Sequence, residues 1–197
     1  HLPEVLTALG HPISTEEAMA RFNWLAGKDF LDAIARWSGA PVPEAFHGLR
    51  AEEDARALAE GIAAVAGAID FVEGLPGDLP RATASSSSSV WIGGHLDHLG
   101  LRGRFAPHIY SGREHVTRGK PAPDIYLHAA ASIGVDIRRA LIIEDSPVGV
   151  TGAVASGAHV IGLCAGSHCA SDHGARLAAL GAHEVVTSFE DLAERIR

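Results

Sequence analysis

Residues 140–163 read ALIIEDSPVGVTGAVASGAHVIGL, and this stretch decides the fold. A short apolar run, Leu141–Ile143, stops at two acids, Glu144 and Asp145, and a Ser-Pro turn follows. A helical stretch of small residues then leads through Gly157 into a second apolar run. The pattern predicts a strand, an acidic loop, a helix and another strand. A doubly wound sheet binds ligands at the carboxyl ends of its strands, where this acidic pair stands.

Strand and helix patterns alternate through the rest of the chain after about residue 68, which indicates a mainly parallel sheet. Further strands are expected at 81–84, 108–111 and 184–187, and helices at 69–75, 90–99, 123–133, 176–180 and 189–196. The part before residue 68 shows helical periodicity and no strand pattern, and its last helix is expected at about 43–64. The sequence therefore predicts an α/β protein with a helical N-terminal subdomain.

The composition excludes several classes of function. A formal charge of −8 without a basic cluster argues against a nucleic-acid surface. No apolar run approaches the length of a membrane span, and no signal segment opens the chain. Cys164 and Cys169 are expected to be reduced thiols, and His168 and His173 are the only nearby residues that could complete a metal site with them. We expect a cytoplasmic monomer that binds neither nucleic acid nor membrane.

A serine run, Ser85–Ser89, follows one predicted strand and leads directly into a helix. A flexible linker is the alternative interpretation. Hydroxyl groups in front of a helix N-terminus are suited to binding phosphate, because the helix dipole is positive there. Ser85 is the best strand-end candidate, with Ser86 and Ser87 as alternatives in register.

A rigid loop, Arg118-Gly-Lys-Pro-Ala-Pro-Asp124, precedes the next helix. Its two prolines restrict the backbone beside Lys120, and Pro123 suits the first turn of a helix. A lysine held in this way could neutralise a phosphoryl group and a neighbouring carboxylate together. A solvated surface lysine is the alternative.

One of the two acids, Glu144 or Asp145, could cap the N-terminus of the following helix, but capping needs only one of them. Hard carboxylate oxygens beside a phosphate are suited to Mg²⁺. We therefore predict a magnesium site at this strand end.

Together, the strand-end serine, the K-P-x-P-D loop and I-I-E-D-S followed by G-x-x-G-A resemble the haloacid dehalogenase superfamily of aspartate-based phosphatases and phosphomutases. The resemblance implies that Ser85 binds the phosphoryl group and that Lys120 offsets its charge and orients the nucleophile. It also implies that Asp145 ligates Mg²⁺ with Glu144 beside it. Lys28 matches a substrate-facing basic position of the family's caps.

The resemblance is closest to the branch with an early helical cap, which includes sugar-phosphate phosphatases and β-phosphoglucomutase-like enzymes. It implies a Rossmann-like core over residues 68–197, with helices on both faces of its sheet, and a cap over residues 1–67. Cap residues such as Trp24, Lys28 and His47 could set the substrate.

The family's first motif, an apolar strand ending in D-x-D-G-T/V, supplies the nucleophilic aspartate and a second aspartate that acts as general acid and base. These 197 residues contain no such motif, and Asp70 stands in a predicted helix. In the family this strand lies between those carrying Ser85 and Asp145, so a sheet without it has unpaired backbone groups at its centre. We therefore expect about twenty further residues before His1 in the natural protein.

The leading hypothesis is a Mg²⁺-dependent phosphatase acting on a small phosphorylated metabolite, such as a sugar or sugar-acid phosphate, through an aspartyl-phosphate. A phosphomutase on the same scaffold and a non-catalytic phosphate-binding protein or fragment are the alternatives. A dehalogenase fits less well, because its chemistry does not need the acidic metal site. A nucleotide-binding Rossmann enzyme would require a G-x-G-x-x-G turn after a strand, which is absent.

Overall fold

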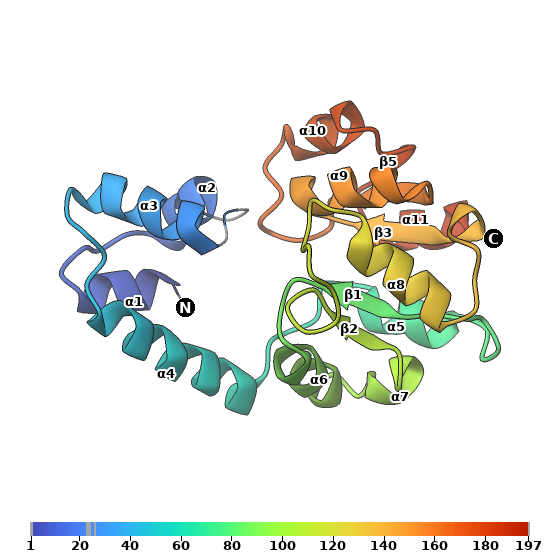
Figure 1. The fold of residues 1–197 in the computed structure, drawn as a ribbon, viewed down its shortest axis with the longest axis horizontal. Helices are drawn as coiled ribbons and strands as arrows, with labels where there is room; N and C mark the ends of the chain where they lie inside the picture. The colour runs from blue at the N-terminus through green and yellow to red at the C-terminus, as the bar shows by residue number, and fades with distance from the viewer. Residues whose placement is uncertain (1, 23–24, 26, 197) are drawn as a thin grey trace. The chain divides into compact units, whose positions relative to one another are not determined.

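The computed structural model describes residues 2–22, 25 and 27–196, and the chain divides into two compact units, His1–Gly61 and Ile62–Arg197 (Figure 1). Over the part that is described, no helix is both long enough and apolar enough to cross a membrane.

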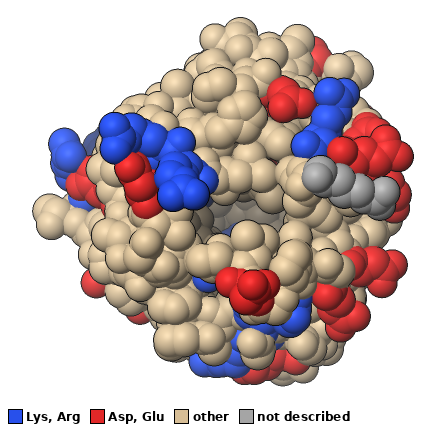
Figure 2. Space-filling view, turned by 90° about the vertical axis from the view of Figure 1, so that its right-hand side faces the viewer, with Lys and Arg blue, Asp and Glu red and all other residues tan. Residues whose placement is uncertain are grey.

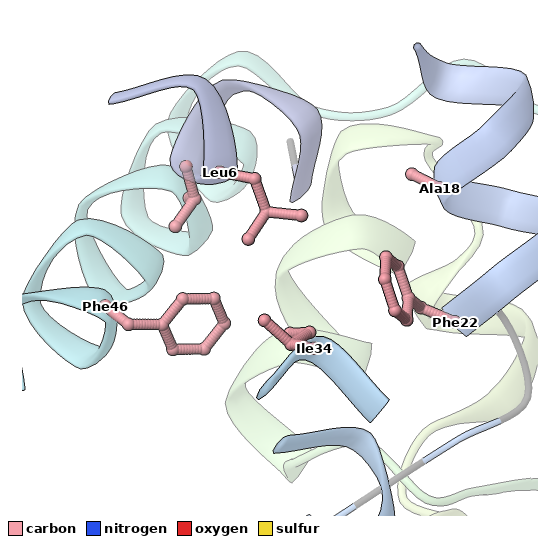
Figure 3. Close-up of a cluster of buried hydrophobic side chains, with 6 residues drawn as sticks. Leu6, Ala18, Phe22, Ile34 and Phe46 are labelled. Carbon is pink, nitrogen blue, oxygen red and sulfur yellow. The ribbon is translucent and has the colours of Figure 1, made fainter. Parts of the chain in front are cut away.

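The first unit is helical, as the sequence predicts. It contains α1 (Leu2–Ala8), α2 (Thr15–Phe22), α3 (Gly27–Ser38) and α4 (Ala45–Glu60). Figure 3 shows its buried apolar side chains converging from all four helices; the cluster consists of Val5, Leu6, Ala18, Phe22, Ile34 and Phe46. The last helix ends at Glu60 rather than near Ala64, because Gly61 adopts a φ of 75° that stops the helix.

The second unit alternates strands with helices. Its elements are α5 (Ala68–Gly74), β1 (Thr83–Ser85), α6 (Ser89–His98), α7 (Arg102–Phe105), β2 (Ile109–Ser111), α8 (Asp124–Ser132), the 3₁₀-helix η1 (Ile137–Arg139), β3 (Leu141–Glu144), α9 (Pro147–Ser156), β4 (His159–Leu163), α10 (His173–Ala179), β5 (Glu184–Val186) and α11 (Phe189–Arg195). The predicted α/β class is confirmed. The first strand begins and ends later than expected, and the short helix α7 was not predicted.

All strand pairs in this unit are parallel, but they form two sheets rather than one. The order is β1-β2 in the first sheet and β3-β4-β5 in the second. Within residues 62–196 no ladder joins β1 to β3. Leu141 and Ile143 of β3 remain 39% and 37% exposed, although parallel strands usually bury their apolar residues on both faces. The break therefore falls between the strand that ends at Ser85 and the strand that ends at Glu144.

Helix α8 connects the two sheets through the core. Its residues Ile125 and Tyr126 are buried, and the cluster they belong to includes Ala84 of β1 and Ile142 of β3. The surface seen in Figure 2 is hollowed at its centre, and most residues around the hollow are neither acidic nor basic. The two sheets are thus held in one core although they share no backbone hydrogen bonds in the described residues.

Candidate active site

A buried ion pair forms the centre of the candidate site. Lys120, from the loop after β2, donates from Nζ to Oε1 of Glu144, the last residue of β3. The two side chains are only 8% and 9% exposed. The Lys120 ammonium also lies 5.0 Å from the ring centroid of Tyr126. Burying two charges is costly unless each is paired and hydrogen-bonded, so this pair needs the support of its surroundings.

Glu144 receives that support from four donors. Its Oε1 accepts from Lys120 and from the Tyr126 hydroxyl at 2.9 Å. Its Oε2 accepts from the backbone N–H of Ser146 at 3.1 Å and from the Ser146 hydroxyl at 2.9 Å. A carboxylate offers about four lone-pair positions, and all are used here. Direct ligation of a metal by Glu144 stays a prediction, and it would require one of these donors to be displaced.

Two glycines of α9 allow the pair to form. A Cβ atom at Gly149 would lie 2.2 Å from the carboxylate carbon of Glu144. A Cβ atom at Gly152 would lie 2.9 Å from the carbonyl oxygen of Ala122, in the loop that carries Lys120. The G-x-x-G spacing therefore lets both the acid and the lysine loop approach the helix closely.

An ion pair clamps the ends of the Lys120 loop. Arg118 donates from Nε to Asp124 Oδ2 at 3.0 Å and from Nη2 to Asp124 Oδ1 at 2.7 Å. This two-point geometry is the strongest way to join a guanidinium and a carboxylate. This clamp is consistent with the sequence prediction that Lys120 is rigidly held.

Asp145 stands apart from the buried pair and is held by the loop after β4. The His168 ring Nε2 lies 3.0 Å from Asp145 Oδ2, and the His173 ring Nε2 lies 2.6 Å from the backbone oxygen of Asp145. The N-cap of α9 is Ser146, whose hydroxyl accepts from the N–H of Gly149 at 3.0 Å. Asp145 is therefore not needed for capping, and its carboxylate is available for another role.

The two adjacent acids have opposite electrostatic environments. Burial opposes ionisation of Glu144, but the Lys120 charge and the hydrogen bonds to the carboxylate outweigh it and lower the pKa of Glu144. Burial and the neighbouring Glu144 charge raise the pKa of Asp145, against the smaller effect of His168. Burial, followed by the Glu144 charge, also raises the pKa of Tyr126, so its hydroxyl remains a donor.

A hollow of about 290 Å³ opens beside Asp145. Glu144, Asp145 and His168 contribute its polar edge. Apolar side chains that include Ile143, Leu163 and Phe189 contribute its walls. A carboxylate oxygen at such a site has the hard-ligand character that Mg²⁺ prefers, so Asp145 fits the predicted ion.

The serine run lies where the sequence places it, at the end of β1. Ser85 is the last residue of that strand, and its hydroxyl accepts from the N–H of Ser87 at 3.1 Å. The carbonyl of Ser86 accepts from Arg113 Nε at 2.9 Å, and Ser88 caps α6. In the described residues no hydrogen bond joins Ser85 to Lys120 or Asp145. Phosphate binding by Ser85 and Ser86 stays a prediction.

Lys28 lies on α3 of the first unit and pairs with Asp32 one turn later. Its side chain is 84% exposed, as expected for a solvated lysine. A role in substrate choice stays a prediction for Lys28, as it does for His47, and Trp24 lies outside the described residues.

Sequence reasoning did not identify Tyr126 or assign His168 and His173 to Asp145. Tyr126 lies 18 positions before Glu144, and its role depends on the packing of α8. Its position two residues after Asp124 of the K-P-x-P-D motif is the only signal the sequence offers. The two histidines were noted only as neighbours of the cysteines, and their spacing gives no indication that both turn back to Asp145.

The fold and these groups define a parallel α/β protein whose site lies at the carboxyl ends of its strands. The family description "haloacid dehalogenase-like hydrolase" matches residues 8–157, and the chain belongs to this family. The resemblance seen in the sequence is confirmed.

Relatives of known name and structure agree with this assignment. The chain is 31% identical to hexitol phosphatase A of Escherichia coli (strain K12) over 158 residues, which cover 78% of this chain and 69% of the relative. A solved haloacid dehalogenase-like protein of unknown function from Agrobacterium tumefaciens str. C58 has a TM-score of 0.85 and 34% identity, covering 98% of this chain and 87% of that one. A family hydrolase from Deinococcus radiodurans R1, solved with bound phosphate and sodium, has a TM-score of 0.83 and 28% identity, covering 99% and 85%.

Proposed function

We propose that the protein is a Mg²⁺-dependent phosphatase of a small phosphorylated metabolite, in the class of sugar and sugar-acid phosphates. The observation that carries the proposal is the buried Lys120–Glu144 pair at the end of β3, with Asp145 beside it at the edge of a hollow. The family membership and the 31% identity to a hexitol phosphatase support the substrate class.

In this proposal Lys120 is the electrostatic partner of the phosphoryl group. An ammonium has three donors, and one of them goes to Glu144, so two remain for phosphoryl oxygens. Glu144 holds Lys120 in position through the buried ion pair. Ser85 and the N-terminus of α6 bind further phosphoryl oxygens through O–H and N–H groups.

Asp145 would hold Mg²⁺, which supplies positive charge to offset the phosphoryl oxygens. His168 orients the Asp145 carboxylate through Oδ2, and His173 fixes the adjacent backbone. The helical unit would act as a cap that excludes water and selects the leaving group.

The nucleophilic aspartate would come from a strand that none of these 197 residues supplies. The break between β1 and β3, with Leu141 and Ile143 left exposed on β3, supports this part of the proposal. That strand would place its carboxyl end between Ser85 and Asp145.

The test is phosphate release by the natural full-length protein from a panel of phosphorylated sugars, sugar alcohols and sugar acids. We expect Mg²⁺-dependent release, lost in Lys120→Met. A mutase would instead convert a hexose 1-phosphate without releasing phosphate. A verified, folded full-length protein that releases none with or without Mg²⁺ would exclude the phosphatase, and full activity at an intact mass near 20.5 kDa would exclude the external nucleophile.

A further inference from the structure

A cluster of two thiols and an imidazole lies in the loop after β4 and at the start of α10. Single ligand atoms from Cys164, Cys169 and His173 all fall within 4.8 Å of one another. These residues have no part in the phosphatase proposal except through the contact of His173 with Asp145. Among the described residues this is the one group of three or more histidine, cysteine or acidic side chains close enough to share a metal ion.

We propose that Cys164, Cys169 and His173 bind a thiophilic divalent cation such as Zn²⁺, at a site separate from the magnesium ligand Asp145. Two sulfur ligands and one nitrogen ligand are a set that zinc prefers, and three protein ligands leave the fourth tetrahedral position open. Mg²⁺ prefers oxygen ligands and would not compete for these atoms.

The dimensions suit the ion after a small closure. With zinc–sulfur bonds of about 2.3 Å, tetrahedral geometry places two sulfur atoms about 3.8 Å apart. The present limit of 4.8 Å between ligand atoms leaves about 1 Å to close. The cluster lies in a loop between a strand and a short helix, which can supply that movement.

Both ends of the cluster are anchored. The N–H of Cys164 donates to Val186 at 2.8 Å, which extends the ladder of β4 with β5. A Cβ atom at Gly174 would lie 3.7 Å from the Cys164 sulfur, so the start of α10 packs directly against that thiol. The N–H of Cys169 donates to Gly166 at 3.0 Å in a turn that brings the second thiol back toward the first.

The histidine has the outer hydrogen bond that metal-binding imidazoles require. The Nε2 atom of His173 lies 2.6 Å from the carbonyl oxygen of Asp145, which can only accept, so in this proposal Nε2 donates and Nδ1 binds the ion. Metal-ligating histidines usually donate their second ring N–H to a carbonyl or carboxylate in this way.

Both cysteines enter the site as thiols, so a cation has to displace their protons. Burial, the neighbouring Cys169 thiol and the Asp145 charge raise the pKa of Cys164 to about 11. Burial and the Asp145 charge also raise the pKa of Cys169. Both groups are therefore protonated thiols before binding, and each releases one proton to solvent as its sulfur bonds to the ion.

The experiment is Co²⁺ titration of the reduced protein in the presence of excess Mg²⁺. We expect a thiolate-to-cobalt charge-transfer band and the visible bands of a tetrahedral ion, with one equivalent per chain and displacement by Zn²⁺. Cys164→Ser, Cys169→Ser and His173→Gln should each weaken binding by more than the roughly 10–100-fold that loss of an outer partner costs. Absence of the thiolate band in the wild type would overturn the proposal.

His168→Gln is the matched control, because His168 lies in the same loop but contacts Asp145 through its side chain. It should retain the cobalt spectrum, and loss in this variant with retention in His173→Gln would contradict the ligand set. If a cysteine variant fails to fold, alkylation of the two cysteines in the wild-type protein provides the test. Zn²⁺ should protect both cysteines, as read by peptide mass, and equal labelling with and without Zn²⁺ would refute the site.

Discussion

Replacing Lys120 by methionine would leave the Glu144 carboxylate buried without its counter-charge. Breaking a buried pair by removing one partner typically costs about 3–5 kcal/mol. Glu144 keeps its donors from Tyr126 and Ser146, so we expect the lower end of this range, about 3 kcal/mol. For a chain of this length the loss corresponds to a fall in melting temperature of roughly 6–12 °C.

A double-mutant cycle separates the pair from the simple loss of packing. Glu144→Gln alone leaves the Lys120 ammonium buried beside a neutral amide and should also cost about 3 kcal/mol. The double variant Lys120→Met/Glu144→Gln contains no buried charge at this position. We expect it to cost about 3 kcal/mol or less, which is well below the sum of about 6 kcal/mol from the single changes.

Urea unfolding followed by circular dichroism measures these values. Lys28→Met is the matched control, since Lys28 is exposed and should leave the unfolding midpoint unchanged. An additive cycle, or an unchanged midpoint in Lys120→Met, would refute the interpretation of the pair. In the active full-length protein Lys120→Met should also lower kcat by about 10²–10³-fold.

Three further predictions test neighbouring features. Gly152→Ala should destabilise the protein by about 1–3 kcal/mol, because its Cβ would press on the carbonyl oxygens of the loop before α8. Gly48→Ala is the control, since it has open space at its Cβ and should not destabilise the protein. Thermal melts of the two variants test this difference. Ser85→Ala should weaken inhibition by inorganic phosphate roughly 10–100-fold without changing the melting temperature, and equal inhibition would remove Ser85 from the phosphate site. Hydrogen bonds from Ser89 lower the pKa of Glu114 in the folded protein. The stabilisation from Glu114 is therefore present above its unfolded-state pKa, near 4.5, and is lost as the pH falls through its folded-state pKa. Glu114→Gln should accordingly reduce stability at pH 7 and match the wild type at low pH, as measured by urea midpoints across pH.

Local patterns in the sequence were enough to place Ser85 and Glu144 at strand ends. Both positions depend on short apolar runs that stop at polar residues, and the structure ends β1 and β3 at these two residues. The prediction carried the last helix of the first unit to about residue 64, although Gly61 was a local signal for its earlier end. These features depend on chemistry within a few residues.

The supporting residues could not be predicted because they join distant segments. Tyr126 and Glu144 are 18 positions apart, and His173 and Asp145 are 28 apart. Which donor reaches which acid depends on how α8 and the loop after β4 pack on the second sheet. Period and spacing along the chain carry no information on that packing.

The two adjacent acids, Glu144 and Asp145, have different partners and different electrostatic environments. The carboxylate of Glu144 is held by Tyr126 of α8 and packs against Gly149 of α9, whereas that of Asp145 is held by His168. One environment lowers a carboxyl pKa through the Lys120 charge, and the other raises a carboxyl pKa through burial and the Glu144 charge. Neighbouring carboxyl groups whose pKa values are pushed in opposite directions usually have different roles. Glu144 then acts as a fixed anion beside Lys120, and Asp145 as a carboxylate that gains from a bound cation. Removal of the cation is therefore expected to affect Asp145 more than Glu144.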